Sequence, residues 1–298
     1  MFIHRDSSTP ANQGTPVWLL VCVSMLAFAG NSLLCRMALK QTTIDPASFT
    51  SLRLLSGACM LWLLVRLRHG SAPAAVGEGG SWWSAFALFA YAAAFSFAYV
   101  GMSAGTGALL LFGSVQVTMI GYGLATGERL RGLQVAGFAL ALGGLVVLLL
   151  PGATTPSWAS SACMVGAGVA WGVYSLRGKR PKGSGAGNPT RVTAGNFARA
   201  APMALALSLL LYGQASADPL GIALALVSGA IASGLGYAIW YRVIPALQAT
   251  HAASVQLSVP VIAALGGVVL LGEPFTLILM VTSAAILGGI ALVIWRKQ

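Results

Sequence analysis

Apolar stretches of about 20 residues recur along the chain, separated by short segments that hold most charged and turn-forming residues. A helix needs about 20 mostly apolar residues to cross the hydrocarbon core of a membrane. Backbone polar groups in lipid must be satisfied within the protein, and these runs are far longer than barrel strands. The pattern therefore predicts ten membrane-spanning helices, at residues 17–37, 47–66, 82–100, 103–125, 131–150, 157–177, 193–213, 219–242, 246–270 and 274–295.

Two long apolar stretches are too long for a single crossing. As one helix, residues 82–126 would extend for about 67 Å at 1.5 Å per residue, twice the membrane thickness. The glycines and serine of residues 101–105 predict the turn there. Residues 219–270 pose the same problem, and Arg242 with Pro245 predicts the break.

One stretch of the chain, residues 107–149, returns in diverged form as residues 252–294. In both copies an apolar run ends at Gly-Glu, at residues 127–128 and 272–273, and a second apolar run contains a Gly-Gly pair. A repeat at half the chain length indicates that the whole chain is duplicated. Because each half holds an odd number of spans, five, the second half must enter the membrane in the opposite direction. The sequence thus predicts an inverted repeat.

Polar residues elsewhere follow the same duplication. The paired positions are Arg36 with Arg177, Arg53 with Arg199, and Tyr91 with Tyr237. The expected organisation is a disordered cytoplasmic tail (1–16), a first five-helix repeat (17–150) and a second, inverted repeat (151–298), with a cytoplasmic connector at 178–192 between spans 6 and 7. The fold class expected is an all-α integral membrane protein.

Composition and charge fit this picture. Of the 298 residues, 57% are hydrophobic and 8% charged, whereas a soluble domain has roughly 25% charged residues. A net charge of +11 would suggest nucleic acid in a soluble protein, but here the basic residues occupy the connectors. If the N-terminus is cytoplasmic, thirteen Lys and Arg fall on the inner side and only Arg36 and Lys40 on the outer side. The positive-inside rule then places both termini in the cytoplasm, with lipid and not nucleic acid as partner.

Catalytic chemistry is poorly represented. The three histidines are far apart in sequence, and the six carboxylates lie at span ends or in loops, so we expect no enzyme, no metal and no cofactor. The four cysteines lie in apolar runs without metal-ligand spacing and are typical of small core residues. His251 is the one titrating group expected inside a span, which favours facilitated diffusion or exchange over coupling to a carboxylate proton relay.

Tyrosines with helical spacing mark a candidate solute site. Tyr91 and Tyr99 share one face of span 3, and Tyr237 and Tyr241 share one face of span 8. Because Tyr91 and Tyr237 are repeat mates, these faces are expected to look at each other across the pseudo-twofold axis. The alternative for each tyrosine is core packing or a place in the interfacial belt.

Further candidates are polar or aromatic residues at helix interiors. They are Asn31, Gln116, Trp171, Tyr174, His251 and Ser258, with Pro260 as a kink or gating point in span 9. Helix packing is the alternative for Asn31. Arg53 and Arg199 either bind a carboxylate substrate or snorkel and pair with backbone carbonyls. Glu128 and Glu273 are expected to cap the helix that follows each of them.

The order of these features resembles the drug/metabolite transporter superfamily, and more narrowly its ten-helix EamA-type exporters, over residues 17–295. The shared features are the two inverted five-span halves, Gly-Glu after spans 4 and 9, an Arg in the second span of each half, and Trp171-Gly172 in span 6. The chain departs from exact symmetry at two places. Span 4 has Ser114-Val115 where span 9 has Pro260, and span 1 has Gly30-Asn31 where span 6 has Trp171-Gly172.

The resemblance implies an inner-membrane exporter of small metabolites that works by alternating access as its halves rock. It also implies a central cavity lined by spans 1, 3, 4, 6, 8 and 9, with spans 5 and 10 peripheral. Amino-acid exporters are the nearest match, because a neutral aromatic cavity suits a zwitterion with an apolar side chain. The alternatives are export of a drug or nucleotide-linked sugar, and a scaffold or channel. The expected partners are a small solute and the bilayer, and a monomer suffices.

Overall fold

The computed structural model describes residues 16–69, 79–127, 129, 132–149, 156–178, 188–243 and 255–295. Every regular element in these ranges is helical. The helices of the first half are α1 (Val17–Gln41), α2 (Pro46–His69), α3 (Trp82–Val100), α4 (Ala104–Ala125) and α5 (Gly132–Leu149). Those of the second half are α6 (Trp158–Gly178), α7 (Pro189–Leu210), η1 (Tyr212–Gln214), α8 (Pro219–Val227), η2 (Ser228–Leu235), α9 (Gly236–Val243), α11 (Ser258–Leu271) and α12 (Leu277–Trp295).

Two of the helices begin at side chains that satisfy free backbone N–H groups. Ser103 accepts a hydrogen bond from the Thr106 backbone N–H at the start of α4, and Asn188 accepts one from Thr190 before Pro189 opens α7. The turn between α3 and α4 falls at residues 101–103, inside the segment expected from the sequence. The long uncharged run is therefore two helices.

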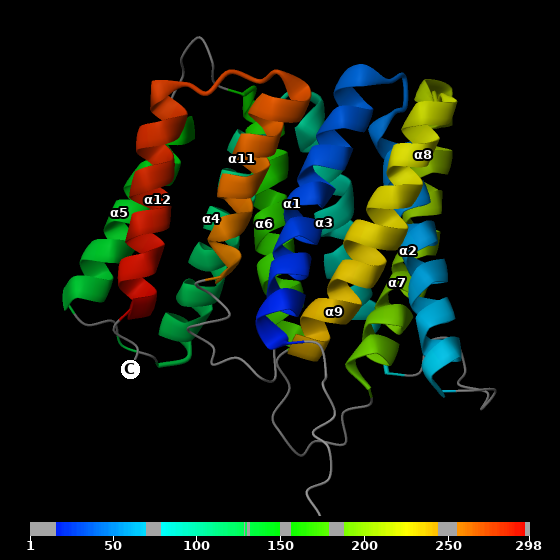
Figure 1. Cartoon of the computed structure of the whole chain (residues 1–298), viewed down its shortest axis with the longest axis horizontal. Helices are drawn as coiled ribbons and strands as arrows, with labels where there is room; N and C mark the ends of the chain where they lie inside the picture. The colour runs from blue at the N-terminus through cyan, green and yellow to red at the C-terminus, as the bar shows by residue number, and fades with distance from the viewer. Residues whose placement is uncertain are drawn as a thin grey trace, which may run out of the picture.

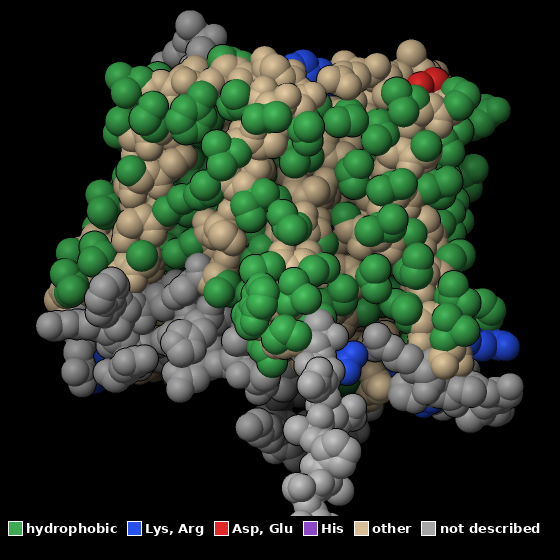
Figure 2. Space-filling view, in the orientation of Figure 1, with side chains coloured by type: hydrophobic (Ala, Val, Ile, Leu, Met, Phe, Trp, Pro, Cys, Tyr) green, Lys and Arg blue, Asp and Glu red, His purple; other side chains and the backbone are tan. Residues whose placement is uncertain are grey.

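The bundle has the composition of a multi-pass membrane protein. Within the described ranges, six helical segments are long and apolar enough to cross a membrane: α1, α2, α3, α4, α6 and the continuous segment 219–243 formed by α8, η2 and α9. The shorter helices α5, α11 and α12 are also apolar. Helix α7, which carries Arg191 and Arg199, packs against α2 and α3. Figure 2 shows hydrophobic side chains over the height of the visible face, with Lys and Arg near its two edges. Lipid covers such a surface.

The helices pack in pairs that are related by exchange of the two halves. The contact of α3 with α6 has its counterpart in α1 with α9, and α4 with α6 has its counterpart in α1 with α11. The pairs α2 with α7, α4 with α11, and α5 with α12 map onto themselves. In Figure 1, α1 rises from the lower edge whereas α6 descends from the upper edge, so equivalent helices run in opposite directions.

One element departs from the expected regular helix. Span 8 is α-helical at both ends but π-helical over η2, Ser228–Leu235. Gly229 allows η2 to lie directly against α2, because a Cβ there would overlap the backbone oxygen of Arg53 and the hydroxyl of Ser56. Short π-helical segments occur frequently at functional sites. This one directs two serine hydroxyls toward the centre of the bundle.

Candidate functional site

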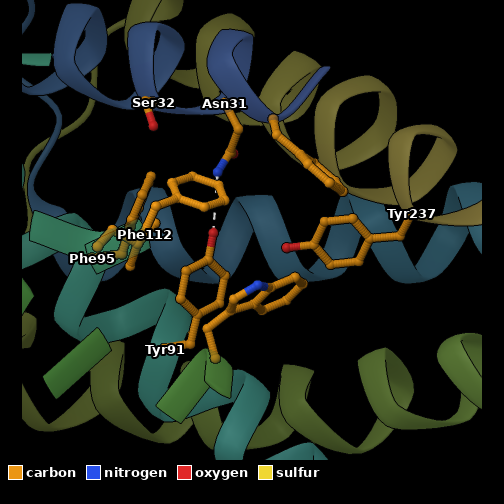
Figure 3. A pocket seen from close by; sticks show the side chains of 9 residues that line it. Asn31, Ser32, Tyr91, Phe95, Phe112 and Tyr237 are labelled. Atoms are coloured by element: carbon orange, nitrogen blue, oxygen red, sulfur yellow. Dashed lines mark hydrogen bonds between the residues drawn. The ribbon is translucent and has the colours of Figure 1, made fainter. Parts of the chain in front are cut away.

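A small cavity lies in the centre of the bundle, between helices of both halves (Figure 3). Its wall consists of Phe28, Asn31 and Ser32 from α1, Tyr91 and Phe95 from α3, Leu111 and Phe112 from α4, Trp171 from α6, and Tyr237 from α9. The cavity measures about 20 Å³, room for one or two water molecules. A solute as large as an amino acid therefore requires the halves to move apart.

Trp171 links the two repeat-mate tyrosines. Its ring centroid lies 4.9 Å from that of Tyr91 and 5.0 Å from that of Tyr237, both at tilted angles. The two tyrosine hydroxyls point toward the same central space in Figure 3. The faces of spans 3 and 8 do approach each other, with an aromatic ring between them. Such a wall offers ring faces to apolar groups and hydroxyls to polar ones.

A chain of hydrogen bonds connects the cavity wall to η2 and α2. The Asn31 amide nitrogen donates to the Tyr91 hydroxyl at 3.3 Å, and the Ser228 hydroxyl donates to the Asn31 amide oxygen at 2.8 Å. Arg53 donates through Nη2 to the same Tyr91 hydroxyl at 3.1 Å and through Nε to the Ser233 hydroxyl at 3.2 Å. Asn31 thus packs helices together and also lines the cavity.

An ion pair links helices of both halves at one end of the bundle. Arg36 Nε lies 2.9 Å from Glu273 Oε1, and Arg36 Nη1 donates to the backbone oxygens of Tyr99 and Val100 at 2.8 and 3.1 Å. Glu273 Oε2 accepts from the backbone N–H of Ala104 at 2.7 Å, at the start of α4. One carboxylate therefore joins α1, the turn between α3 and α4, and the segment between α11 and α12.

The expected capping by Glu273 is wrong. The following helix, α12, takes its cap from Thr276, whose hydroxyl accepts from the Leu279 backbone N–H at 3.2 Å. Glu273 instead places its charge at the positive N-terminus of α4 in the other half. Contacts across 169 residues of sequence leave no local signal. Glu128 lies outside the described residues.

The cavity brings together four of the candidates from the sequence, Asn31, Tyr91, Trp171 and Tyr237. The other described candidates lie outside its wall. Tyr99 is buried and donates to the Ala104 backbone oxygen, Tyr174 accepts from the Asn196 amide, Tyr241 packs on the core, Gln116 is buried on α4, and Ser258 donates to the Val255 backbone oxygen. His251 lies outside the described residues.

Span 9 is arranged differently from the expectation. Among the described residues, α11 contributes none of the cavity wall and packs on α1 and α4 instead. The helix is interrupted at Leu257, and Pro260 lies buried in the first turn of α11 rather than in the middle of a continuous span. The missing N–H of a proline is least disruptive in a first turn.

Several wall residues were not predicted from the sequence: Phe28, Ser32, Leu111 and Phe112. In a helix that is apolar on every face, such residues give no indication of which face lines a cavity. It also missed the two η2 serines. Their signal was a cluster of small residues, Ser228-Gly229 and Ser233-Gly234, within span 8.

Comparisons with known proteins agree with this architecture. The EamA-like transporter family profile matches residues 158–295. An uncharacterized protein of Pseudomonas aeruginosa is 57% identical over 276 residues, which cover 93% of each chain. This chain belongs to the EamA-like transporter family. A crystal structure of another protein aligns with this EamA-like chain at a TM-score of 0.67, and the alignment covers 95% of this chain and 99% of the other. Because the two sequences are 18% identical, this similarity supports the fold alone.

As an EamA-like protein of the drug/metabolite transporter superfamily, the chain is a multi-pass membrane transporter. Inverted-repeat carriers bind their solutes at the repeat interface near the bilayer midplane, and the central cavity lies between helices of both halves. Over the described part of the chain, no three His, Cys, Asp or Glu side chains cluster so that they could hold a metal ion.

Proposed function

We propose that this transporter exports small metabolites, with amino acids as the favoured class, across the cell inner membrane. The observation that supports it is the cavity itself: its wall combines the aromatic rings of Tyr91, Trp171 and Tyr237 with the amide of Asn31, and the described wall contains no carboxylate. Ring faces suit an apolar side chain or an ammonium group, and hydroxyl and amide groups suit a polar head.

Alternating access fits the closed form of the cavity. In the proposed orientation both termini are cytoplasmic, so the Arg36–Glu273 pair lies on the outer side. With that side closed and the cavity too small for a solute, transport requires the ion pair to separate as the halves rock. The transporter then works by exchange or facilitated diffusion, because an arginine stays charged and the described cavity wall holds no titrating acid.

Counterflow in liposomes tests the proposal. Purified protein is reconstituted with one unlabelled amino acid inside, and uptake of the same radiolabelled amino acid is followed over a panel. We expect saturable uptake with competition between related solutes. Absence of flux for every amino acid would refute the amino-acid assignment, non-saturable flux would indicate a channel, and accumulation driven by a pH gradient alone would refute passive exchange.

A further inference from the structure

Arg53 is a buried cation without a carboxylate beside it in the described part of the chain. It lies on α2 and is 1% exposed, with its guanidinium carbon 5.2 Å from the ring centroid of Tyr91 and 5.0 Å from that of Phe95. Both rings belong to the cavity wall. Among the described residues, the salt bridge that forms is between Arg36 and Glu273, and no carboxylate lies within salt-bridge distance of Arg53. A charge buried in this way is expensive unless a partner compensates it.

The hydrogen bonds of Arg53 leave one nitrogen unused. Nε donates to Ser233 and Nη2 donates to Tyr91, whereas Nη1 is buried without any hydrogen-bond partner among the described residues. The N–H groups of a guanidinium form charge-assisted hydrogen bonds with a carboxylate, which are stronger than those between neutral groups. The partners already present hold the plane of the guanidinium in place, and Gly229 of η2 packs against the Arg53 backbone.

We propose that Arg53 is the specificity residue of this transporter and binds the carboxylate of the solute through Nη1 when the cavity is open. The inference rests on the proposed transport function and narrows it to solutes that carry a carboxylate. The anion neutralises the buried charge, and the rest of the solute lies against the rings of Tyr91, Trp171 and Tyr237. A solute with a neutral amide in place of the carboxylate leaves Arg53 uncompensated.

The repeat mate of Arg53 offers a matched control. Arg199 on α7 is only half-buried, lies 5.8 Å from the ring centroid of Trp82, and donates to the Gly195 backbone oxygen at 3.1 Å. Neither Trp82 nor Gly195 belongs to the cavity wall. The same substitution can therefore be made at equivalent sequence positions, one beside the cavity and one away from it.

Binding to purified protein in detergent, measured by calorimetry, tests the assignment without requiring flux. The probes are carboxylate and carboxamide pairs of equal shape: propionate and propionamide, isovalerate and isovaleramide, 3-phenylpropionate and 3-phenylpropionamide. In at least one pair we expect the wild type to bind the carboxylate about 10-fold or more tightly than the amide, as one charge-assisted hydrogen bond provides. We expect Arg199→Gln to keep this preference for the carboxylate, Arg53→Gln to bring the affinity ratio to about one, and Arg53→Lys to lower it.

The assignment is overturned if the wild type binds carboxylate and carboxamide equally in every pair, or if it binds no carboxylate. It is also overturned if Arg53→Gln keeps the full wild-type preference for the carboxylate. If Arg53→Gln does not elute as a folded monodisperse species, the carboxylate-to-amide affinity ratios of the wild type and of Arg53→Lys provide the test. An Arg53→Lys protein that keeps the full wild-type ratio rules out recognition by the guanidinium group. Failures of the two proposals are distinguishable. Flux of amino acids without a carboxylate preference removes the Arg53 assignment alone, whereas an Arg53-dependent preference without any flux removes transport alone.

Discussion

Separation of the Arg36–Glu273 pair can be measured through a cysteine already present beside it. Cys35 is 0% exposed in the closed structure and precedes Arg36 on α1. With Cys22, Cys59 and Cys163 changed to alanine, Cys35 is the one remaining thiol. Its rate of reaction with a hydrophilic maleimide then reports the fraction of molecules that open at this end.

Glu273→Gln removes the charge but keeps the shape of the side chain. Glu273 is 6% exposed and the Arg36 side chain 13% exposed, so little water screens the pair. A hydrogen bond to a charged group contributes about 1.5–3 kcal/mol. The amide oxygen of the variant can still accept from the Ala104 backbone N–H, so we expect the closed state to lose about 2 kcal/mol, which is roughly a 30-fold rise in the open population.

The expected result is a rise of roughly 30-fold in the labelling rate of Cys35, if opening and closing are fast relative to labelling. Asp218→Asn is the matched control, because Asp218 lies at the same end of the bundle but accepts from Thr43 instead of an arginine. The exchanged pair Arg36→Glu with Glu273→Arg is expected to restore part of the protection. A folded Glu273→Gln protein that labels at the wild-type rate would refute the idea that this pair holds the end closed.

Three further predictions concern the cavity, the packing of the halves and one helix cap. Tyr91→Ala and Tyr237→Ala are each expected to lower liposome flux at least about 10-fold, since each removes a ring and a hydroxyl from the wall, and unchanged flux would mean that the cavity is misplaced. Gly289→Val is expected to lower stability by about 1–3 kcal/mol in chemical unfolding, because a Cβ there would lie 2.5 Å from the Gly137 backbone oxygen, whereas a neutral result would show that α5 and α12 can separate freely. Burial raises the pKa of Asp45, but hydrogen bonds from the start of α2 and from residue 216 outweigh it and lower the pKa below its ordinary value. Its stabilising contribution is therefore present at neutral pH and lost as the pH falls below about 4, so Asp45→Ala is expected to cost about 1 kcal/mol at pH 7 and less at pH 3, and an equal loss at both values would refute the charge as its cause.

The sequence was sufficient for the helices because lipid imposes a length and a composition on each crossing. The turn at residues 101–103 and the interior placement of Tyr91 and Tyr237 followed from length and from helical periodicity. The relation between the halves was also accessible, since an odd number of spans per repeat requires opposite directions. These inferences use only local or counting information.

The cavity wall and the closing ion pair depend on contacts between distant segments. Glu273 meets Arg36 and Ala104 across the two halves, and no sequence spacing indicates that meeting. The π-helical geometry of η2 rotates Ser228 and Ser233 toward α1 and α2, which a regular helical wheel for span 8 would not show. Tertiary packing decides such details. Of the ten candidate residues chosen by helical spacing or by polar and aromatic character, four line the cavity, and the others lie elsewhere or outside the described residues.

Arg36 and Arg177 occupy equivalent positions in the two repeats, but their contacts differ. Arg36 pairs with a buried carboxylate at one end of the bundle, whereas its mate Arg177, at the opposite end, donates through Nε to the Ser84 hydroxyl at 3.2 Å and is exposed. A buried charge pair is worth more than an exposed contact to a hydroxyl, because water screens the latter. Among the described residues, the contact with a buried carboxylate lies at the Arg36 end. The Glu273 carboxylate joins α1, the turn between α3 and α4, and the segment between α11 and α12, so removing its charge is expected to redistribute the conformations instead of unfolding the protein.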